Sequence, residues 1–522
     1  MRSTFHGLET AKRSLFTQQA ALSTTGHNIA NANTVGYSRQ VVNITASRPI
    51  EASGLMSSNA PGQLGTGVEF TSITRMREKF LDDQYRNENK SYGNWTIQAG
   101  TMDKLEAIIN EPSDTGIRKV LDNFWKSWSD LAKDPDNVTG RKIVKENAMA
   151  LSNAFNFTNK QLQDLQNDLS SNIEVKSTEI NSITSSIASM NGEIQRIEGL
   201  GDNANDLRDQ RDNLVDQLSG IVNITVTETG QGYAINMGNV NLVNGNTSIP
   251  VSAASLNAAK AANVLVGGEV YGMIVSRDQY VSDYINQLDT LANTIMSGEF
   301  EITIPAGSVL PKNTEIEVKT ATGYEKKTIS DTEREVQEPG LTVRIKGING
   351  LHKLGYNMSG NSGVDFFTGT GASDFQVNPD IANNPSNIAT SMRTITDGTV
   401  ETVVKGNNTL ASLMFNMKDV KFTFVDPGNT AITTNGSLSD YYNSIVGQLG
   451  VQGSEATRQS QNQKALVEQV DSRRQSVSGV SLDEEMSNMI KFQHAYNAAA
   501  RFMTSLDEVL DKVINGMGVV GR

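Results

Sequence analysis

The side chains that most often carry out catalysis or hold metals are scarce in this chain of 522 residues, which has four histidines and no cysteine. His6, His27, His352 and His494 are too far apart for a His-Glu-x-x-His zinc site. Without cysteine there is no thiol nucleophile, zinc–thiolate site, iron–sulfur cluster or disulfide. We therefore expect no catalytic, cofactor-binding or metal-binding residues.

Two acidic groups could bind a cation instead. Aspartates recur at the four positions 202, 206, 209 and 212, but Ala204 and the missing central glycine break the spacing of a calcium loop, so a charged helix face is favoured. Asp483, Glu484 and Glu485 are consecutive and splay around a helix rather than converge. We favour a role in the first turn of a helix, where the dipole attracts acidic groups, and keep cation binding as the alternative.

Nucleotide binding has equally little support. The short pieces Gly65-Thr66-Gly67 and Gly369-Thr370-Gly371 lack the third glycine of a dinucleotide loop, and there is no Gly-x-x-x-x-Gly-Lys-Ser/Thr motif. A hydrolase within the inserted stretch 299–348 remains an alternative with little support from the sequence. We predict that the chain is not an enzyme.

Charge and hydropathy exclude further classes of function. The formal net charge is −13 and the pI is about 5.0, which disfavours binding to nucleic acid or to an anionic membrane surface. No apolar run approaches the ~18 residues of a membrane span, so we expect no membrane insertion. The first residues lack the apolar stretch of a secretory signal, which by itself indicates a cytoplasmic protein.

Heptad spacing marks both ends of the chain. Near the start, Leu8, Leu15 and Leu22 continue a seven-residue repeat from Met1. Near the end, the repeat consists of Leu482, Met489, Tyr496, Met503 and Leu510, with Phe492, Ala499, Leu506 and Val513 between them. A narrow apolar seam must be covered by another helix, so we expect these two helices to pair in coiled-coil fashion.

A polar loop follows the first helix. Asn31, Thr34, Gly36 and Tyr37 lie in it, and glycine supplies a bend that a side chain would oppose. We expect these four residues to shape the loop before the alternating stretch 41–45. The stretch 53–67, with Pro61, is expected to be an extended connection.

The rest of the chain is helical at its flanks and β-rich in its middle. We predict one helix over 116–157 with Phe124, Trp125 and Trp128 as core anchors, and a heptad rod over 169–197. The predicted fold is mainly α with a β-rich middle, an α+β multidomain protein whose central β domains project outward. The predicted domains are 1–60 with 476–522, 61–220 with 426–475, 221–298 with 349–425, and an inserted β subdomain at 299–348.

Motifs at both ends then show a family resemblance. The stretch Asn28–Gln40 (NIANANTVGYSRQ) resembles the N-terminal signature of the bacterial flagellar axial proteins, and 478–515 is similar to their C-terminal helix. The continuation Tyr37-Ser38-Arg39-Gln40, together with 206–212 and 374–379, resembles the hook-associated group of that family. Residues 298–349 depart from the pattern, as an insertion would.

The resemblance implies a structural adaptor that joins hook to filament. It further implies export in a largely unfolded state by the flagellar type III route, which needs no cleaved signal, and assembly into a ring of identical subunits by packing of the terminal helices. The implied partners are other copies of the chain, the hook protein, hook-associated protein 3 as second junction protein, and an export chaperone. The implied location is the extracellular hook–filament junction, which reverses the cytoplasmic interpretation. Alternatives are a hook or distal rod protein, or a cytoplasmic coiled-coil scaffold.

Overall fold

The fold is described from a computed structural model that covers residues 5–49, 65–111, 113, 116–397, 400–424 and 435–516. Met1 and most of the predicted connection 53–67 lie outside these residues. The chain divides into two compact units. Unit 1 consists of 1–95, 174–271 and 460–522, and unit 2 consists of 96–173 and 272–459. The long helices α2, α4 and α12 contribute a segment to each unit.

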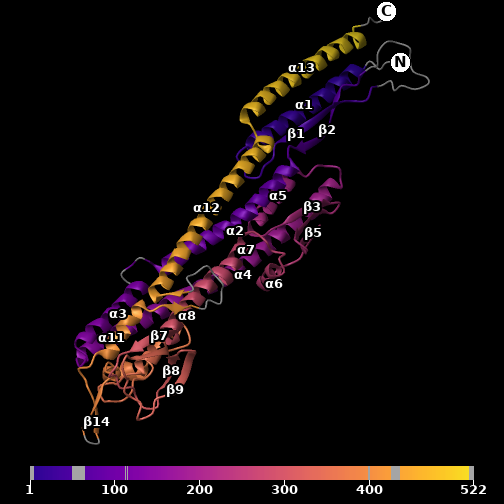
Figure 1. Ribbon diagram of the computed structural model, residues 1–522. Coiled ribbons are helices and arrows are strands. Elements are labelled where there is room, and N and C mark those ends of the chain that lie inside the picture. The colour runs from indigo at the N-terminus through magenta and orange to yellow at the C-terminus, as the bar shows by residue number, and fades with distance from the viewer. Residues whose placement is uncertain are drawn as a thin grey trace, which may run out of the picture. The chain divides into compact units, whose positions relative to one another are not determined.

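The described chain is mostly helical, which confirms the predicted fold class (Figure 1). The helices are α1 (His6–Ala30), α2 (Lys79–Ile109), α3 (Ile117–Lys133), α4 (Val138–Glu198), α5 (Asn205–Ile221), α6 (Ala253–Ala261), α7 (Glu269–Val275), α8 (Ser282–Ser297), α9 (Gly347–His352), α10 (Pro379–Asn383), α11 (Thr409–Asn416), α12 (Leu438–Ser478) and α13 (Leu482–Ile514). A π-helical turn, Ser276–Val281, joins α7 to α8, and 3-10 turns lie at Pro385–Asn387 and Met417–Asp419. Within these described residues, no helix combines the length and apolar character that crossing a membrane would require.

The described part of unit 1 contains two antiparallel sheets. The first is a hairpin of β1 (Gln40–Ala46) and β2 (Val68–Arg75), which both contact α1. The second is a meander whose strands lie in chain order, namely β3 (Thr225–Thr229), β4 (Gly232–Met237), β5 (Val240–Asn244) and β6 (Thr247–Ser248). The turn between β3 and β4 lies at 229–232.

Unit 2 contains the strand-rich stretch that departs from the family pattern. It folds into a four-stranded antiparallel sheet in the order β7-β10-β8-β9, formed by β7 (Glu299–Ile304), β8 (Glu315–Thr320), β9 (Gly323–Thr328) and β10 (Leu341–Lys346). On its outer face Arg344 stands opposite Glu301 and Glu317, so opposite charges are neighbours across strands. Among the residues of unit 2 that the structure describes there are also three short hairpins: β11 (Phe367–Thr368) with β12 (Gln376–Val377), β13 (Thr394–Asp397) with β14 (Val400–Val403), and β15 (Phe422–Thr423) with β16 (Asn435–Gly436).

One predicted helix is wrong in its extent. The stretch 116–157 is not continuous, because α3 ends at Lys133 and α4 begins at Val138. Pro135 has no N–H to donate and disfavours helical geometry in the residue before it. Asn137 then caps the new helix, since its Oδ1 accepts from the backbone N–H of Thr139 at 2.8 Å. The predicted heptad rod 169–197 is the second half of the 61-residue helix α4.

The core of unit 2 is aromatic. Phe124, Trp125 and Trp128 are at most 1% exposed, which confirms their prediction as core anchors. The ring of Trp128 lies 5.6 Å from that of Phe366. The ring of His352 contacts the same Phe366 edge-on at 5.4 Å and is completely buried. His352 is therefore a packing residue of this core.

Candidate assembly site at the base of the terminal helix pair

The first and last helices, α1 and α13, lie side by side and run antiparallel (Figure 1). Near the start of α1, a Cβ atom at Gly7 would lie 2.9 Å from Leu506 Cδ1. Near its end, Asn28 is hydrogen-bonded to Glu485. The start of α1 thus contacts the second half of α13, and the end of α1 contacts the start of α13. The two helices therefore form an antiparallel pair.

The residues of the predicted seam are only partly covered. Most are half-buried: Leu8, Leu15, Leu22, Met489, Tyr496, Met503 and Leu510. Leu482 is 49% exposed. The fully buried side chains of α1 are small or polar, namely Ala11, Thr17, Ala21, Thr24, Thr25 and Asn28. Small residues let α1 approach its neighbours closely.

The predicted loop residues form a compact turn after α1. The backbone N–H of Thr34 donates to Asn31 O at 2.9 Å, and that of Tyr37 donates to Thr34 O at 3.2 Å. Gly36 has a φ of +81°, a left-handed conformation that favours glycine. A Cβ atom there would also lie 3.1 Å from Asn213 Cβ of α5. The turn therefore brings the loop against α5.

Asn28, which the sequence reasoning did not single out, organises this loop. Its Oδ1 accepts from Tyr37 Oη at 2.8 Å and from the backbone N–H of Gln40 at 3.0 Å. Its Nδ2 donates to Gln40 O at 2.9 Å and to Glu485 Oε2 at 3.1 Å. All four hydrogen-bonding positions of this buried amide are thus filled. Burial, together with the nearby carboxylates of Asp206, Asp209 and Glu485, raises the pKa of Tyr37, so its hydroxyl remains a donor.

Two acidic residues at the start of α13, Glu484 and Glu485, bind Arg39 of the N-terminal motif 28–40. Arg39 Nε donates to Glu485 Oε1 at 2.8 Å and Arg39 Nη1 to Glu484 Oε2 at 2.9 Å. Ser481 is the N-cap residue of α13. Glu485 is 2% exposed despite its charge. Within the described ranges, no group of three or more histidine or acidic side chains is arranged to hold a metal ion. The structure therefore gives Glu484 and Glu485 a protein partner in Arg39.

A second charged cluster lies under the loop, on α5. Asp209, Asp212 and Asp216 share one face of the helix, and the structure buries this face rather than exposing it to solvent. Ser38 N–H donates to Asp209 Oδ2 at 2.8 Å. Arg75 Nη1, at the end of β2, donates to Asp209 Oδ1 at 2.6 Å and to Asp212 Oδ2 at 2.9 Å.

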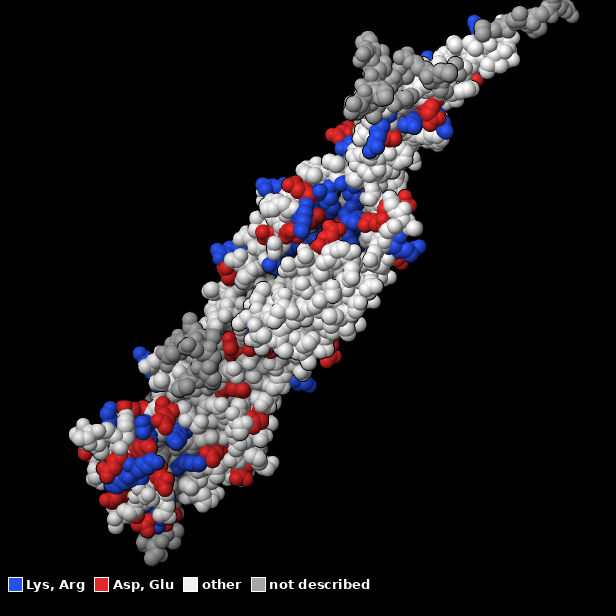
Figure 2. Space-filling view, turned by 90° about the vertical axis from the view of Figure 1, so that its right-hand side faces the viewer, with Lys and Arg blue, Asp and Glu red and all other residues white. Residues whose placement is uncertain are grey.

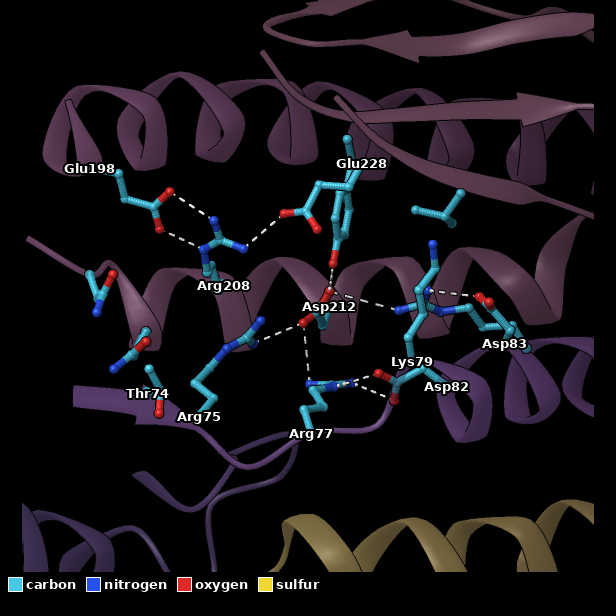
Figure 3. Close-up of a pocket in the computed structure, with 15 residues that line it drawn as sticks. Thr74, Arg75, Arg77, Lys79, Asp82, Asp83, Glu198, Arg208, Asp212 and Glu228 are labelled. Carbon is cyan, nitrogen blue, oxygen red and sulfur yellow. Dashed lines mark hydrogen bonds and ion pairs between the residues drawn. The ribbon is translucent and has the colours of Figure 1, made fainter. Parts of the chain in front are cut away.

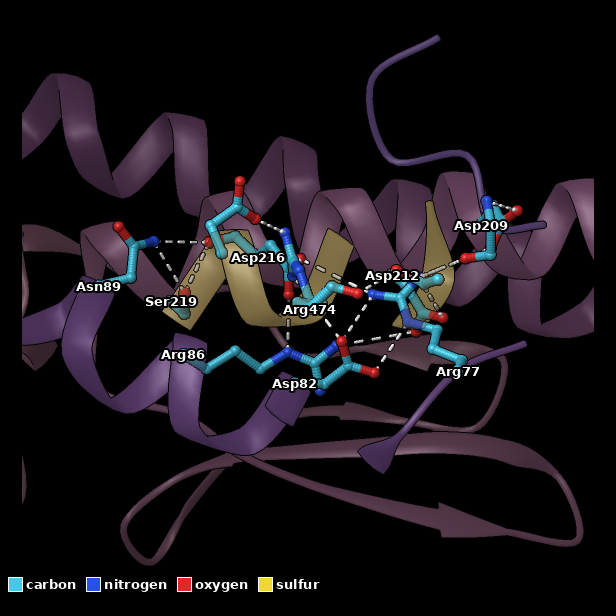
Figure 4. Close-up of polar contacts among 12 residues, drawn as sticks. Arg77, Asp82, Arg86, Asn89, Asp209, Asp212, Asp216, Ser219 and Arg474 are labelled. Atoms are coloured by element: carbon cyan, nitrogen blue, oxygen red, sulfur yellow. Dashed lines mark hydrogen bonds and ion pairs between the residues drawn. The ribbon is translucent and has the colours of Figure 1, made fainter. Parts of the chain in front are cut away.

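Arginines from three elements neutralise these aspartates (Figure 4). Arg77, just after β2, lies 3.3 Å from Asp212 and also forms a two-pronged pair with Asp82 of α2, at 2.8 and 3.0 Å. Arg86 of α2 donates from Nε to Asp216 Oδ1 at 2.8 Å, and Arg474 of α12 also binds Asp216. The cluster therefore ties α2, α5 and α12 together beneath the terminal pair, within unit 1.

The electrostatics of Asp212 follow from its surroundings. Burial alone would raise its pKa, but Arg77, Arg75 and Arg86 outweigh that effect and lower it to about 2. Burial also raises the pKa of Asp209, only partly offset by Arg75. Asp212 also accepts a 2.8 Å hydrogen bond from Tyr233 Oη of β4.

Beside Asp212 lies a cavity of about 350 Å³ (Figure 3). Five basic and five acidic side chains line it: Arg75, Arg77, Lys79, Arg86 and Arg208 with Asp82, Asp83, Glu198, Asp212 and Glu228. Figure 3 shows several of them paired across the cavity, as Arg208 is with Glu198 and Glu228. Figure 2 likewise shows blue and red side chains intermingled within the charged clusters of that face. Paired charges of this kind hold elements in place.

The sequence reasoning did not assign the contacts of several residues of this site. Asn28, Ser38, Arg39 and Gln40 all lie within the recognised motif 28–40, and Glu485 belongs to the acidic trio. The available signal was a basic residue, Arg39, in the N-terminal motif and an acidic trio in the C-terminal one.

Comparisons with known proteins identify the family. Residues 102–299 match the model of the helical domain of flagellar hook-associated protein FlgK. Residues 8–37 match the flagella basal body rod protein model, and 472–516 match the C-terminal model of the flagellar basal body rod FlgEFG proteins. The chain is 36% identical to flagellar hook-associated protein 1 of Bacillus subtilis (strain 168), over all of both chains. It is 25% identical to flagellar hook-associated protein 1 of Escherichia coli (strain K12), over 97% of this chain and 99% of the other.

A solved structure supports the fold. The structure of the flagellar hook junction protein FlgK from Burkholderia pseudomallei superposes with a TM-score of 0.50 at 15% identity, over 75% of this chain and all of that one. The rod models match only the two terminal segments, whereas the hook-associated relatives match the whole chain. The chain therefore belongs to the flagellar hook-associated protein 1 family and is an extracellular structural component of the flagellum, at the hook–filament junction, with no enzymatic role.

Proposed function

We propose that the chain joins hook to filament as a ring of identical subunits that assembles through α1 and α13. The chain reaches this position by the flagellar type III export route in a largely unfolded state. Its partners are further copies of itself, the hook protein, hook-associated protein 3 and an export chaperone. The family membership and the resemblance of both chain ends to flagellar axial proteins support this proposal.

The observation that carries the proposal is the incomplete burial of the terminal pair. Besides the half-buried heptad residues, α13 carries large apolar side chains that are each 46–66% exposed, the seam residues Leu482 and Val513 among them: Leu482, Met486, Ile490, Phe502, Val509, Val513 and Ile514. Phe5 and Phe16 near and on α1 are each 57% exposed. Apolar surface of this extent is stabilised when another protein covers it. Packing against further copies of the same pair would cover it.

The same proposal assigns roles to the predicted regions. Residues 1–60 with 476–522 would line the inner wall of the tube, with Leu8, Leu15, Leu22, Leu482, Met489, Tyr496, Met503 and Leu510 in the packed layer. Asn31, Thr34, Gly36 and Tyr37 would set the turn at the base of that layer. The helical region 61–220 with 426–475 would form a second layer, and the β-rich regions 221–298 with 349–425 and 299–348 would face outward.

Substitutions on the exposed face of α13 test the proposal. Ile490→Asp and Phe502→Asp change side chains that are 54% and 48% exposed, so the single chain should still fold. In cells they should abolish filament growth, because a charge would be buried between subunits. Ser487→Asp and Thr504→Asp, at exposed polar positions of the same helix, serve as controls and should support filaments.

Met489→Asp and Leu506→Asp, at half-buried positions, should also block incorporation while unit 2 stays folded. The measurements are electron microscopy of hooks and filaments, and detection of the protein in the medium of filament-defective cells. Normal filaments on cells with Ile490→Asp and Phe502→Asp would contradict assembly through α13. Retention of the unaltered protein inside filament-defective cells would contradict the export route.

A further inference from the structure

The buried residues of α13 are Ala499 and the charged Glu485. The large apolar residues of the predicted seam are only half-buried or exposed, and the buried residues of α1 are small or polar. Half-buried apolar side chains lose less contact when two helices shift past each other than a buried, paired charge does. Apolar packing therefore specifies the register of α1 against α13 less sharply than a buried charge.

Glu485 behaves differently, because its carboxylate has two partners on separate segments of the chain. Oε2 accepts from Asn28 Nδ2 at 3.1 Å, and Oε1 accepts from Arg39 Nε at 2.8 Å. Arg39 is itself held in place, since its backbone N–H donates to Ser478 O and its backbone O accepts from Met76 N–H, both at 2.8 Å. Asn28 has no free hydrogen-bonding position with which to adapt.

A shift of α13 by one helical turn would move its residues by about 5.4 Å along the axis. The carboxylate of Glu485 would then lose both partners, and Asn28 would lose one. A buried charge without a partner is strongly unfavourable, whereas the half-buried apolar residues would exchange one set of apolar neighbours for another. This carboxylate therefore contributes the largest single share of the energetic difference between registers.

We infer that Glu485, held by Asn28 and Arg39, is the residue that specifies the register of the antiparallel terminal pair. Glu484, its neighbour, has a 63% exposed side chain and pairs with Arg39 at the surface. It keeps access to water in any register and does not carry this function. The two adjacent glutamates thus form a matched pair for a test.

Disulfide trapping in the full-length protein can measure the register directly, because the chain has no cysteine of its own. Gly7→Cys combined with Leu506→Cys reports the native register, since position 7 abuts Leu506. Gly7→Cys combined with Leu510→Cys or with Met503→Cys reports shifts of about one turn in the two directions. Each pair is placed in the unaltered background, in Glu485→Gln and in Glu484→Gln, and the monomer fraction from size-exclusion chromatography is oxidised and quantified.

In the unaltered chain and in Glu484→Gln, the 7–506 disulfide should predominate. In Glu485→Gln, the ratio of the 7–506 product to the shifted products should fall about tenfold or more, while helical circular dichroism is retained. Arg39→Gln, which removes the charged partner of the same carboxylate, should move the ratio in the same direction. An unchanged ratio in Glu485→Gln would overturn the inference. So would an equal loss of all three disulfides with a loss of helicity, since that would show a pair that separates rather than shifts.

Discussion

The backbone N–H of Ser38 donates a 2.8 Å hydrogen bond to Asp209 Oδ2, and so joins the loop after α1 to α5 across 171 residues of sequence. The same carboxylate accepts from Arg75 at 2.6 Å. One buried aspartate thus holds both the loop that follows the terminal helix and the end of the hairpin β1–β2. The terminal pair is positioned on the helices of unit 1 by buried charge as well as by apolar packing.

Removing this aspartate should therefore weaken unit 1. Asp209→Asn removes the charge that binds Arg75 and weakens the acceptor of Ser38; because burial raises the pKa of Asp209 and Arg75 keeps Asp212 as a partner, we expect a cost of about 1–3 kcal/mol. Chemical denaturation followed by circular dichroism measures the change. Asp206→Asn is the control, because Asp206 has a 56% exposed side chain and should lose less than about 1 kcal/mol. Equal effects of the two substitutions would contradict the role of Asp209.

Two glycines near the end of α1 should respond in opposite directions. Gly36→Ala should destabilise by about 1–2 kcal/mol, because its φ is +81° and a Cβ would press on Asn213. Gly26→Ala should stabilise by about 0.5–1 kcal/mol, because Gly26 lies inside α1 and a Cβ there meets nothing within 4 Å. Thermal unfolding of both variants beside the parent measures the two effects. A destabilised Gly26→Ala would show that a neighbour of α1 occupies that space.

Unit 2 should lose stability in mild acid through His352. Burial lowers the pKa of His352 to about 4, and its Nε2 accepts from the backbone N–H of Ala389 at 2.8 Å while Nδ1–H donates to Val364 O. In the unfolded chain, His352 binds a proton near pH 6.5. The stability that comes from the buried neutral His352 is therefore complete above pH 6.5 and disappears between pH 6.5 and 4. The total loss should be about 3 kcal/mol.

The fluorescence of Trp125 and Trp128 reports this change, because Trp128 and His352 both contact Phe366. His352→Gln serves as control, since it keeps hydrogen-bonding groups but does not titrate in this range. Its stability should be nearly flat between pH 6.5 and 4. A parent protein with an equally flat profile would contradict a buried neutral His352.

Unit 1 should respond to stronger acid through Asp212. Its pKa of about 2 lies below the ordinary value of 3.8, so it contributes stability above about pH 4 that disappears as the pH falls toward 2. The loss should be about 2 kcal/mol, because between pH 4 and 2 the arginines keep Asp212 charged in the folded chain, whereas it is protonated in the unfolded chain. Stability of the parent and of Asp212→Asn between pH 5 and 2, measured with denaturant, tests this. The variant should be less stable at pH 5 and show a shallower decline below pH 4; parallel curves would contradict the prediction.

The candidate site was predictable in part. Asn31, Thr34, Gly36 and Tyr37 stand out as a turn because glycine and asparagine chemistry acts over a few neighbouring residues. The contact between Asn28 and Glu485 does not follow from the sequence, because this hydrogen bond joins positions 457 residues apart. No local pattern tells which distant partner a side chain will meet.

Helix positions show the same limit. The heptads of α1 and α13 follow from local spacing, and so does the pairing of two narrow seams. The break at Asp134–Asn137 was present in the sequence as Pro135, but the helical periodicity on both sides concealed it. A proline outweighs periodicity because it removes a backbone donor.

The sequence by itself determined the helical ends, the β-rich middle and the motifs of the flagellar family, because periodicity and short motifs are properties of neighbouring residues. Only the tertiary structure decided that the aspartates of α5 face a buried cluster rather than solvent. Arg75, Arg86 and Arg474 come from β2, α2 and α12, and together they neutralise that face. Whether a charged face is buried depends on the opposite charges that the fold brings to it, and those come from three distant parts of the chain.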